Sequence, residues 1–221
     1  MTGPPAPPLS LPEELLLLSL DRARGRPVCQ TKFLRYGLAG AALADLAVAG
    51  RIAVERGDRV VVVNPLPLAD PVLTGALAAL PDPAKGGRGV KAHRWVRTAG
   101  RSVHELCLFR LQQRGAVRRE TKRALGLFPY DRYPVGAVDL TEPARFHFRA
   151  AVEGGLADGR ARTLAGLVAA IDLDTKLLPG SGFRPARRSL RGLAKTEWPA
   201  RSAFHAVRQD KASAANAGGG G

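Results

Sequence analysis

Two helical stretches rich in Leu and Ala each stop at a glycine and are followed by the pattern of a β-hairpin. The first covers about residues 30–49, stops at Gly50 and precedes two β-branched runs around the turn residues 57–58. The second covers about residues 90–114, with an alternative break near Gly100, stops at Gly115 and precedes segments 116–123 and 124–130. Two such units are too few for a solenoid, so we interpret them as parts of one helical core that carries hairpins.

The remaining patterns also predict helices. Ser10, Pro12 and Glu13 are typical of a helix N-terminus, because they supply a cap, a preset first turn and a charge that suits the helix dipole. Further helices are predicted over residues 70–80, 141–154, 158–178, 185–196 and 199–208. The expected fold is mainly α, a single-domain helical core over residues 11–208 with one or two β-hairpins, the second protruding. The Pro-rich residues 1–10 and the Gly-rich residues 209–221 are expected to be disordered tails.

The charge of the chain is strongly positive and unevenly distributed. Its 221 residues include 34 Lys and Arg against 19 Asp and Glu, a formal net charge of +15. Residues 85–132 hold 13 basic and 3 acidic side chains, and residues 184–221 hold 8 and 2, whereas the rest is nearly neutral. This excess indicates a polyanionic partner, either nucleic acid or an anionic membrane surface. Arg outnumbers Lys by 27 to 7, which suits bidentate phosphate contacts and, with many Ala and Gly, is typical of a bacterium with a GC-rich genome.

Catalytic and metal-binding patterns are absent from the sequence. The chain has no P-loop, dinucleotide fingerprint or HExxH motif, and Cys29 and Cys107 are too few for a Cys-only zinc site. His104 and Cys107 have helical spacing, but no third group orients them as a nucleophile pair. We therefore expect a protein that is not an enzyme and that needs neither a cofactor nor a metal.

Two binding classes remain open. A helix followed by Gly50 and a two-stranded wing is typical of a winged-helix DNA-binding protein, although residues 40–49 carry no basic or amide side chain to contact DNA. The alternative is a membrane-surface protein, because the second hairpin combines cations with the apolar residues Leu125, Leu127, Phe128 and Tyr130. The longest apolar run, residues 15–18, is too short to span a bilayer, and because no positively charged start precedes it we do not expect a secretory signal.

The order of several segments resembles the Golgi phosphoprotein 3 family. These are residues 11–20, 37–52, 115–117, 125–130 and 164–178, within a resemblance that covers about residues 11–208. The resemblance implies a helical domain with a protruding hairpin, and a non-catalytic adaptor that binds phosphatidylinositol 4-phosphate on the cytoplasmic face of a membrane. It also implies client membrane enzymes and self-association through the hairpin, whereas nucleic acid becomes the less favoured partner.

The resemblance also suggests individual site residues. Arg101 matches a basic position of the family's lipid pocket, and His104 is a partial match one helical turn away. Gln30 and Ala39 stand where the family has Trp and Arg, so the identity of the headgroup stays open. We expect Arg101 and His104 to contact the headgroup and Arg97 and Arg94 to widen the basic patch; the four apolar hairpin residues are candidates for self-association or membrane contact.

Overall fold

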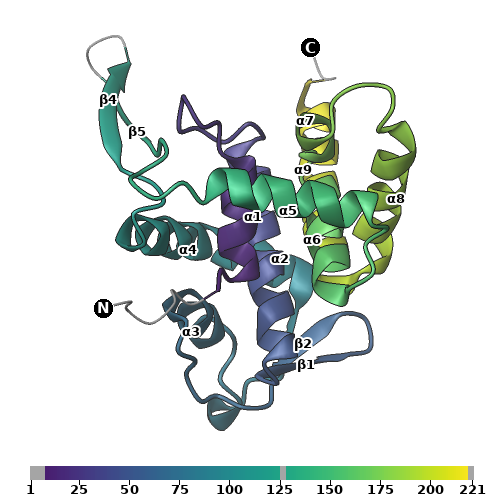
Figure 1. The fold of residues 1–221 in the computed structure, drawn as a ribbon. Coiled ribbons are helices and arrows are strands. Elements are labelled where there is room, and N and C mark those ends of the chain that lie inside the picture. Colours follow the sequence, from purple (N-terminus) through teal and green to yellow (C-terminus); the bar gives the residue numbers. More distant parts are fainter. Residues whose placement is uncertain (1–7, 125–127, 219–221) are drawn as a thin grey trace.

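Helix α2 (Thr31–Val48) runs through the centre of the molecule (Figure 1). The structure is a computed structural model that describes residues 8–124 and 128–218. Helix α2 packs against α1 (Leu11–Ser19), α4 (Ala92–Gln113) and α9 (Trp198–Gly218). Leu34, Leu38 and Leu43 of α2 are completely buried in this packing. The expectation of a mainly α fold is confirmed, and residues 40–49 belong to a core helix.

Helix α1 begins as the sequence predicts. Ser10 is its N-cap, and the backbone N–H and the hydroxyl of Ser10 both donate to Glu13 Oε2, at 2.9 and 3.0 Å. Glu13 is itself fully buried and forms an ion pair with Arg114, with 3.1 Å between Oε1 and Nε. The cap therefore also ties the start of α1 to the end of α4.

The other helices surround this centre. Helix α3 (Pro71–Ala78) is capped by Asp70, whose carboxylate accepts hydrogen bonds from the backbone N–H groups of Val72 and Leu73. Helix α5 crosses in front of α1 and α2, and α6, α7 and α8 lie with α9 on the right of Figure 1. Their bounds are α5 Thr141–Glu153, α6 Gly159–Ala170, α7 Asp174–Leu177 and α8 Arg184–Thr196, and a short 3₁₀ helix, η1, covers Pro83–Lys85.

Both predicted hairpins are present. The first pairs β1 (Ile52–Glu55) with β2 (Arg59–Val62), and β3 (Val90–Lys91) adds a third antiparallel strand beside β2. The second pairs β4 (Glu120–Ala124) with β5 (Phe128–Arg132) and extends away from the helices, as Figure 1 shows. Leu125 and Leu127, two of the predicted contact residues, lie outside the described residues.

Two helices differ in extent from the prediction. The helix predicted over residues 158–178 is divided into α6 and α7, because Asp172 adopts a left-handed conformation with φ of 60°. The bend lets Ile171, Leu173 and Leu178 all be fully buried, which a straight helix would not allow. Asp is among the few residues that accept this conformation readily, so the sequence signal was weak.

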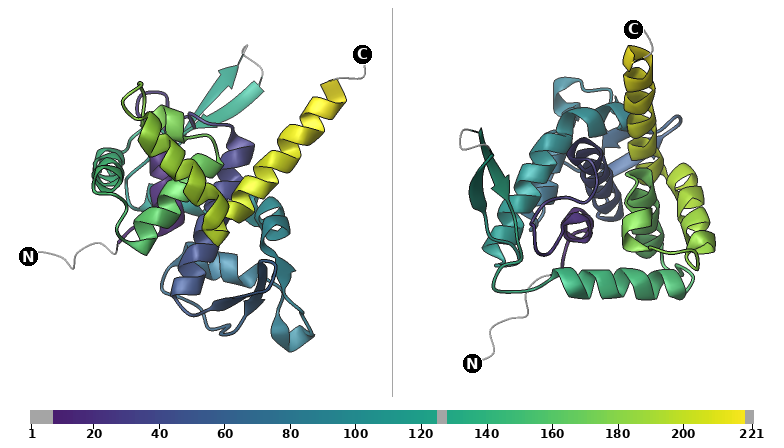
Figure 2. Two further views of the ribbon diagram at one scale, coloured as in Figure 1. Left: turned by 90° about the vertical axis from the view of Figure 1, so that its right-hand side faces the viewer. Right: turned by 90° about the horizontal axis from the view of Figure 1, so that it is seen from above.

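The C-terminal tail expected from residue 209 is instead helical as far as Gly218. Helix α9 continues because its Ala-rich end favours helix and because Asp210 anchors it to α2 and α4. Figure 2 shows α9 projecting beyond the neighbouring helices.

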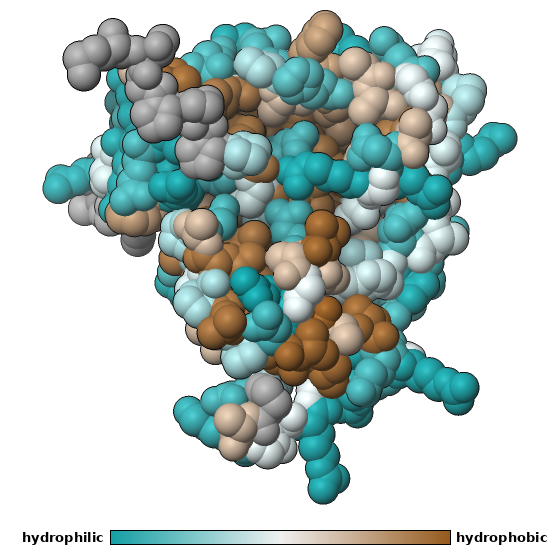
Figure 3. Space-filling model, turned by 60° about the horizontal axis from the view of Figure 1, so that its bottom comes forward, coloured by the Kyte–Doolittle hydropathy of each residue, from teal (hydrophilic) through white to brown (hydrophobic). Residues whose placement is uncertain are grey.

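An apolar surface lies at the end of the molecule that is opposite the tip of α9. Val48, Val63 and Leu66 are 90%, 57% and 63% exposed there. Figure 3 shows apolar side chains gathered on this face, where α2 ends and the loop between β2 and α3 passes. No helix in the described part of the chain is both long enough and apolar enough to cross a bilayer.

Candidate functional site

Three of the four predicted headgroup residues lie on one exposed stripe of α4. Arg94, Arg97 and Arg101 are all exposed, whereas the intervening Trp95, Val96, Ala99 and Gly100 are buried. Successive helical residues turn by about 100°, so positions 94, 97 and 101 lie within about 60° of one another. The structure thus brings the three guanidinium-bearing side chains to the same side of the helix.

The three arginines differ in their partners. Arg97 forms an ion pair with Asp210 at 3.1 Å and donates to Gln209 at 2.9 Å, so it links α4 to α9. Arg101 is paired with Glu105 at 2.9 Å, but both side chains are largely exposed, and such pairs exchange readily with water or ligand. Arg94 has no ion pair with any carboxylate among the described residues. Arg94 and Arg101 are therefore the side chains most available to an external anion.

Asp210 organises the neighbouring cations. Its Oδ2 lies 2.6 Å from Lys32 Nζ and accepts a 2.7 Å hydrogen bond from the hydroxyl of Tyr36. Burial tends to raise the pKa of Asp210, but the hydrogen bonds from Lys32 and Tyr36 and the charge of Arg97 outweigh it, so the pKa is lowered. Asp210 is therefore a stable anion that holds Lys32 and Arg97 in place.

His104, the fourth predicted contact, differs from its expected role. Its side chain is only 9% exposed, and burial together with the charge of Arg35 lowers its pKa to about 4. A neutral, buried imidazole supplies no positive charge to a phosphate at neutral pH. The one-turn spacing from Arg101 is correct, but the packing of α4 on α2 takes His104 into the interior.

Arg35 is a site residue that the sequence reasoning missed. It lies on α2 beside Gly100 of α4, where a side-chain Cβ on Gly100 would sit 2.6 Å from the backbone oxygen of Arg35. The Arg35 side chain is half-buried, and its Nε is buried with no hydrogen-bond partner in the described part of the chain. The sequence did hint at this role, because Arg35 lies one helical turn before Ala39, the position where the resemblance leads one to expect an Arg.

The loop between α1 and α2 was missed as well. Asp21 accepts hydrogen bonds from the backbone N–H groups of Ala23 and Arg24, which forms a tight turn. Gly25 in this turn accepts a 2.7 Å hydrogen bond from the backbone N–H of Tyr133, and Arg26 stacks 4.1 Å above the ring centroid of Tyr130. The loop is thus docked on the base of the second hairpin. The sequence already indicated a basic loop at this place, because Arg22, Arg24 and Arg26 fall within five residues.

We define the α4 surface as Lys32, Arg35, Arg94, Arg97 and Arg101. Of these five cations, Lys32 and Arg97 are paired with Asp210, and Arg101 is paired with Glu105. A comparison with protein families matches one family, Golgi phosphoprotein 3 (GPP34), over residues 11–209. The chain belongs to the Golgi phosphoprotein 3 family. No curated protein matches the chain in a sequence search. Family membership is consistent with a non-catalytic, lipid-binding adaptor.

The two positions that depart from the family pattern lie in different environments. Gln30 is the exposed N-cap of α2, whereas Ala39 is completely buried within α2. Arg35, one helical turn before Ala39, is the nearest cation on α2, and its side chain is half-buried.

The second hairpin of this family member carries exposed cations next to paired ones. Lys122 and Arg123 of β4 are exposed, and Arg119 is held by Asp131 at 2.7 Å. Tyr130 is half-buried, with Arg26 and Arg132 stacked against its ring. Phe128 is part of β5.

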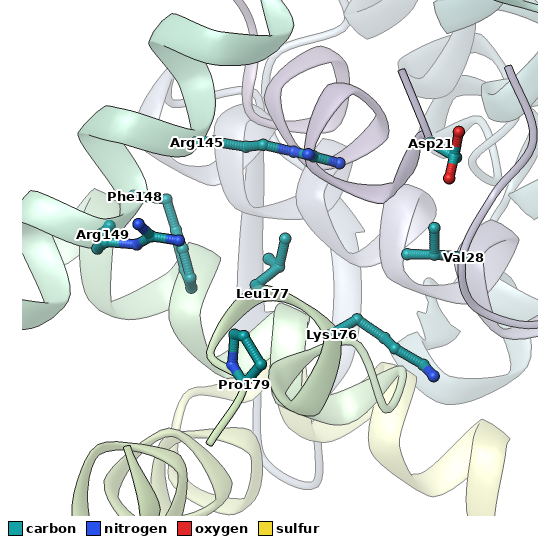
Figure 4. A pocket seen from close by; sticks show the side chains of 8 residues that line it. All are labelled: Asp21, Val28, Arg145, Phe148, Arg149, Lys176, Leu177 and Pro179. Carbon is teal, nitrogen blue, oxygen red and sulfur yellow. The ribbon is translucent and has the colours of Figure 1, made fainter. Parts of the chain in front are cut away.

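A separate hollow of about 310 Å³ lies between α5, α7 and the loop that follows α1 (Figure 4). Phe148, Leu177 and Val28 form its apolar part, and Arg145 reaches across it. The guanidinium of Arg145 donates to the backbone oxygen of Leu20 at 2.7 Å. Arg145 is thus engaged in holding the loop, so we read the hollow mainly as a structural junction.

The thiols are poor nucleophiles in this fold. Burial raises the pKa of Cys29 to about 12 and raises that of Cys107 well above its usual value. No group of three His, Cys, Asp or Glu residues in the described ranges is placed to hold a metal ion.

Proposed function

We propose that this protein is a peripheral membrane adaptor that binds anionic phospholipid headgroups through the α4 surface. Phosphatidylinositol 4-phosphate is the first headgroup to test, because the family resemblance implies it and because Arg side chains bind phosphate with two hydrogen bonds. In this proposal the protein acts from the cytoplasmic face of a membrane, without catalysis, and recruits client membrane enzymes.

The observation that supports the proposal best is the shared exposed side of Arg94, Arg97 and Arg101. Arg35 adds a half-buried guanidinium from α2, at the point where the backbone of α2 lies against Gly100 of α4. The field of five cations attracts an anionic surface over a Debye length of about 8 Å.

The hairpin extends this surface in the proposal. Exposed Lys122 and Arg123 would meet headgroups, and Leu125, Leu127, Phe128 and Tyr130 are proposed to contact the membrane or a second hairpin. Tyr130 is the weakest of the four for this role, because Arg26 and Arg132 already cover its ring.

A vesicle sedimentation assay tests the proposal. We compare phosphatidylcholine vesicles with and without phosphatidylinositol 4-phosphate, using the wild type, Arg94→Gln, Arg101→Ala and the control Arg149→Gln. Arg149 is exposed on α5, which packs on α1 and α6. Since each cation near an anionic surface contributes about 1 kcal/mol, each α4 variant should bind about fivefold more weakly.

Two results would contradict the proposal. Equal binding to neutral and anionic vesicles would exclude headgroup recognition, and an equal loss in Arg149→Gln would show that only the net charge matters. Salt-sensitive binding to duplex DNA without vesicle binding would favour the winged-helix alternative. The helix before the first hairpin is unsuited to be its recognition helix, because residues 37–44 of α2 are all buried.

A further inference from the structure

Helix α8 carries a second concentration of positive charge that the proposed membrane surface does not use. Five cations fall within its 13 residues, and they line a groove of about 670 Å³ beside Thr175 and Gly192. The five are Arg184, Arg187, Arg188, Arg191 and Lys195. In Figures 1 and 2, α8 lies on the opposite side of the molecule from α4 and the second hairpin.

The spacing puts all five side chains on one face of the helix. Positions 184, 188, 191 and 195 follow the i, i+4, i+7, i+11 order of a single stripe, and 187 lies beside it. The other side of α8 holds Leu190 and Ala194, which are buried in the core. The helix is thus divided sharply into an apolar inner face and a cationic outer face.

Two of the five cations have structural partners. Arg187 donates to the backbone oxygens of Leu178 and Gly180, which closes the loop before α8. Arg191 is paired at 2.8 Å with Asp174, whose side chain is only 2% exposed. These two contacts fix the wall of the groove.

The other three cations are available. Arg184, Arg188 and Lys195 are exposed, and none of them has an ion pair with a carboxylate of the described residues. The first two are unfavourably placed in the isolated helix, because Arg184 and Arg188 lie one turn apart and repel, and because a cation in the first turn opposes the helix dipole. A bound polyanion would remove both costs at once.

The residues that line the groove limit the kinds of anion that it could bind. Apart from the cations it is lined by Thr175 and Gly192, so it offers no apolar side chain to insert into a bilayer. It likewise offers no aromatic ring on which a base could stack and no amide to read a base edge. The groove can therefore recognise the phosphate groups of an anion and no other part of it. The three free cations extend over about 16 Å of helix axis, more than one phosphate spans.

We propose that the α8 groove is a second anion site that takes a soluble anion with several linked phosphate groups. It works independently of the α4 surface, so that the protein can hold a membrane on one side and a polyphosphate-type anion on the other.

Isothermal titration calorimetry with tripolyphosphate tests this proposal. The wild type should bind it saturably and more tightly than orthophosphate. The triple variant R184Q/R188Q/K195Q should bind it at least about tenfold more weakly. Arg187 and Arg191 are left unchanged because they hold the loop and Asp174, and matching thermal melts of variant and wild type check the fold. The matched variant R94Q/R101Q removes charge from α4; it should weaken only a second, looser binding event there and keep the tighter event that we assign to α8.

The outcomes separate this site from the membrane surface. The triple variant should keep its binding to vesicles that contain phosphatidylinositol 4-phosphate, which R94Q/R101Q should weaken. The proposal is overturned if tripolyphosphate does not bind, or if the triple variant binds it as the wild type does. It is also overturned if the triple variant loses only vesicle binding or only duplex DNA binding, since the groove would then serve a membrane or a nucleic acid.

Discussion

Asp210 couples the stability of α9 to the charge of the α4 surface, so replacing it should move two measurable properties in opposite directions. Its carboxylate meets Lys32 at 2.6 Å, Arg97 at 3.1 Å and the hydroxyl of Tyr36 at 2.7 Å. The side chain of Asp210 is 9% exposed, whereas those of Lys32 and Arg97 are 61% and 38% exposed. The two ion pairs are therefore screened by solvent, and the hydrogen bond from Tyr36 is the better protected contact.

The expected change in the free energy of unfolding follows from these exposed fractions. The ion pair with Arg97 contributes about 0.5 kcal/mol, the pair with the more exposed Lys32 adds little, and the hydrogen bond to a charged group contributes about 1.5 kcal/mol. Asp210→Ala should thus lower the free energy of unfolding by about 2 kcal/mol. For a chain of this size that corresponds to a fall in Tm of about 4–8 °C. Asp210→Asn keeps an acceptor for Tyr36 and should lose about half as much.

Binding to anionic vesicles should strengthen in the same variants, whereas stability falls. Asp210→Asn raises the charge of the α4 surface by one unit and releases Arg97 and Lys32. At about 1 kcal/mol per charge near an anionic surface, binding to vesicles that contain phosphatidylinositol 4-phosphate should strengthen about fivefold. Circular dichroism melts and vesicle sedimentation measure the two effects on the same preparations.

The control is Glu153→Gln, which adds the same charge at an exposed position at the end of α5. It should leave both stability and vesicle binding near the wild-type values. Weaker vesicle binding by Asp210→Asn would refute the reasoning, because it would mean that Arg97 needs its carboxylate partner more than the surface gains from the charge. An unchanged Tm would show that Asp210 does not anchor α9.

Four further variants test the packing of individual residues. Glu13→Ala leaves Arg114 without its buried carboxylate and should cost about 3–5 kcal/mol in urea denaturation, whereas a loss below 1 kcal/mol would mean that water replaces the pair. Gly100→Ala places a Cβ 2.6 Å from a backbone oxygen of α2 and should destabilise by about 1–3 kcal/mol. Gly192→Ala meets nothing within 4 Å and should stabilise by about 0.5–1 kcal/mol, so equal effects of the two glycine variants would contradict the packing. His104 has a folded pKa of about 4 against 6.5 for the free group, so its contribution to stability is complete above about pH 6.5 and is lost as the pH falls toward 4. His104→Gln should flatten that part of the stability profile, and an unchanged profile would show that His104 is not buried.

Local sequence signals sufficed for much of the fold. Ser10, Pro12 and Glu13 place the start of α1, Gly50 and Gly115 follow the ends of α2 and α4, and both hairpins form where their patterns predict. These signals act within a few residues, through caps, dihedral preferences and side-chain periodicity. The stripe of Arg94, Arg97 and Arg101 follows from the same periodicity once α4 is recognised.

Other features of the fold depend on contacts between helices that are far apart in the chain, and only the tertiary structure revealed them. The bend at Asp172 and the extension of α9 to Gly218 depend on contacts with distant residues, such as the core around Ile171 and the partners of Asp210.

The sequence by itself therefore determined the helical class, the cationic face of α4 and the excess of charge on α8. Only the tertiary structure decided that His104 is buried and neutral, that Arg35 of α2 joins the α4 surface, and that α8 faces away from it. The physical reason is that periodicity sets which residues share a side of one helix. Burial and electrostatic surroundings depend instead on how helices far apart in the chain pack together.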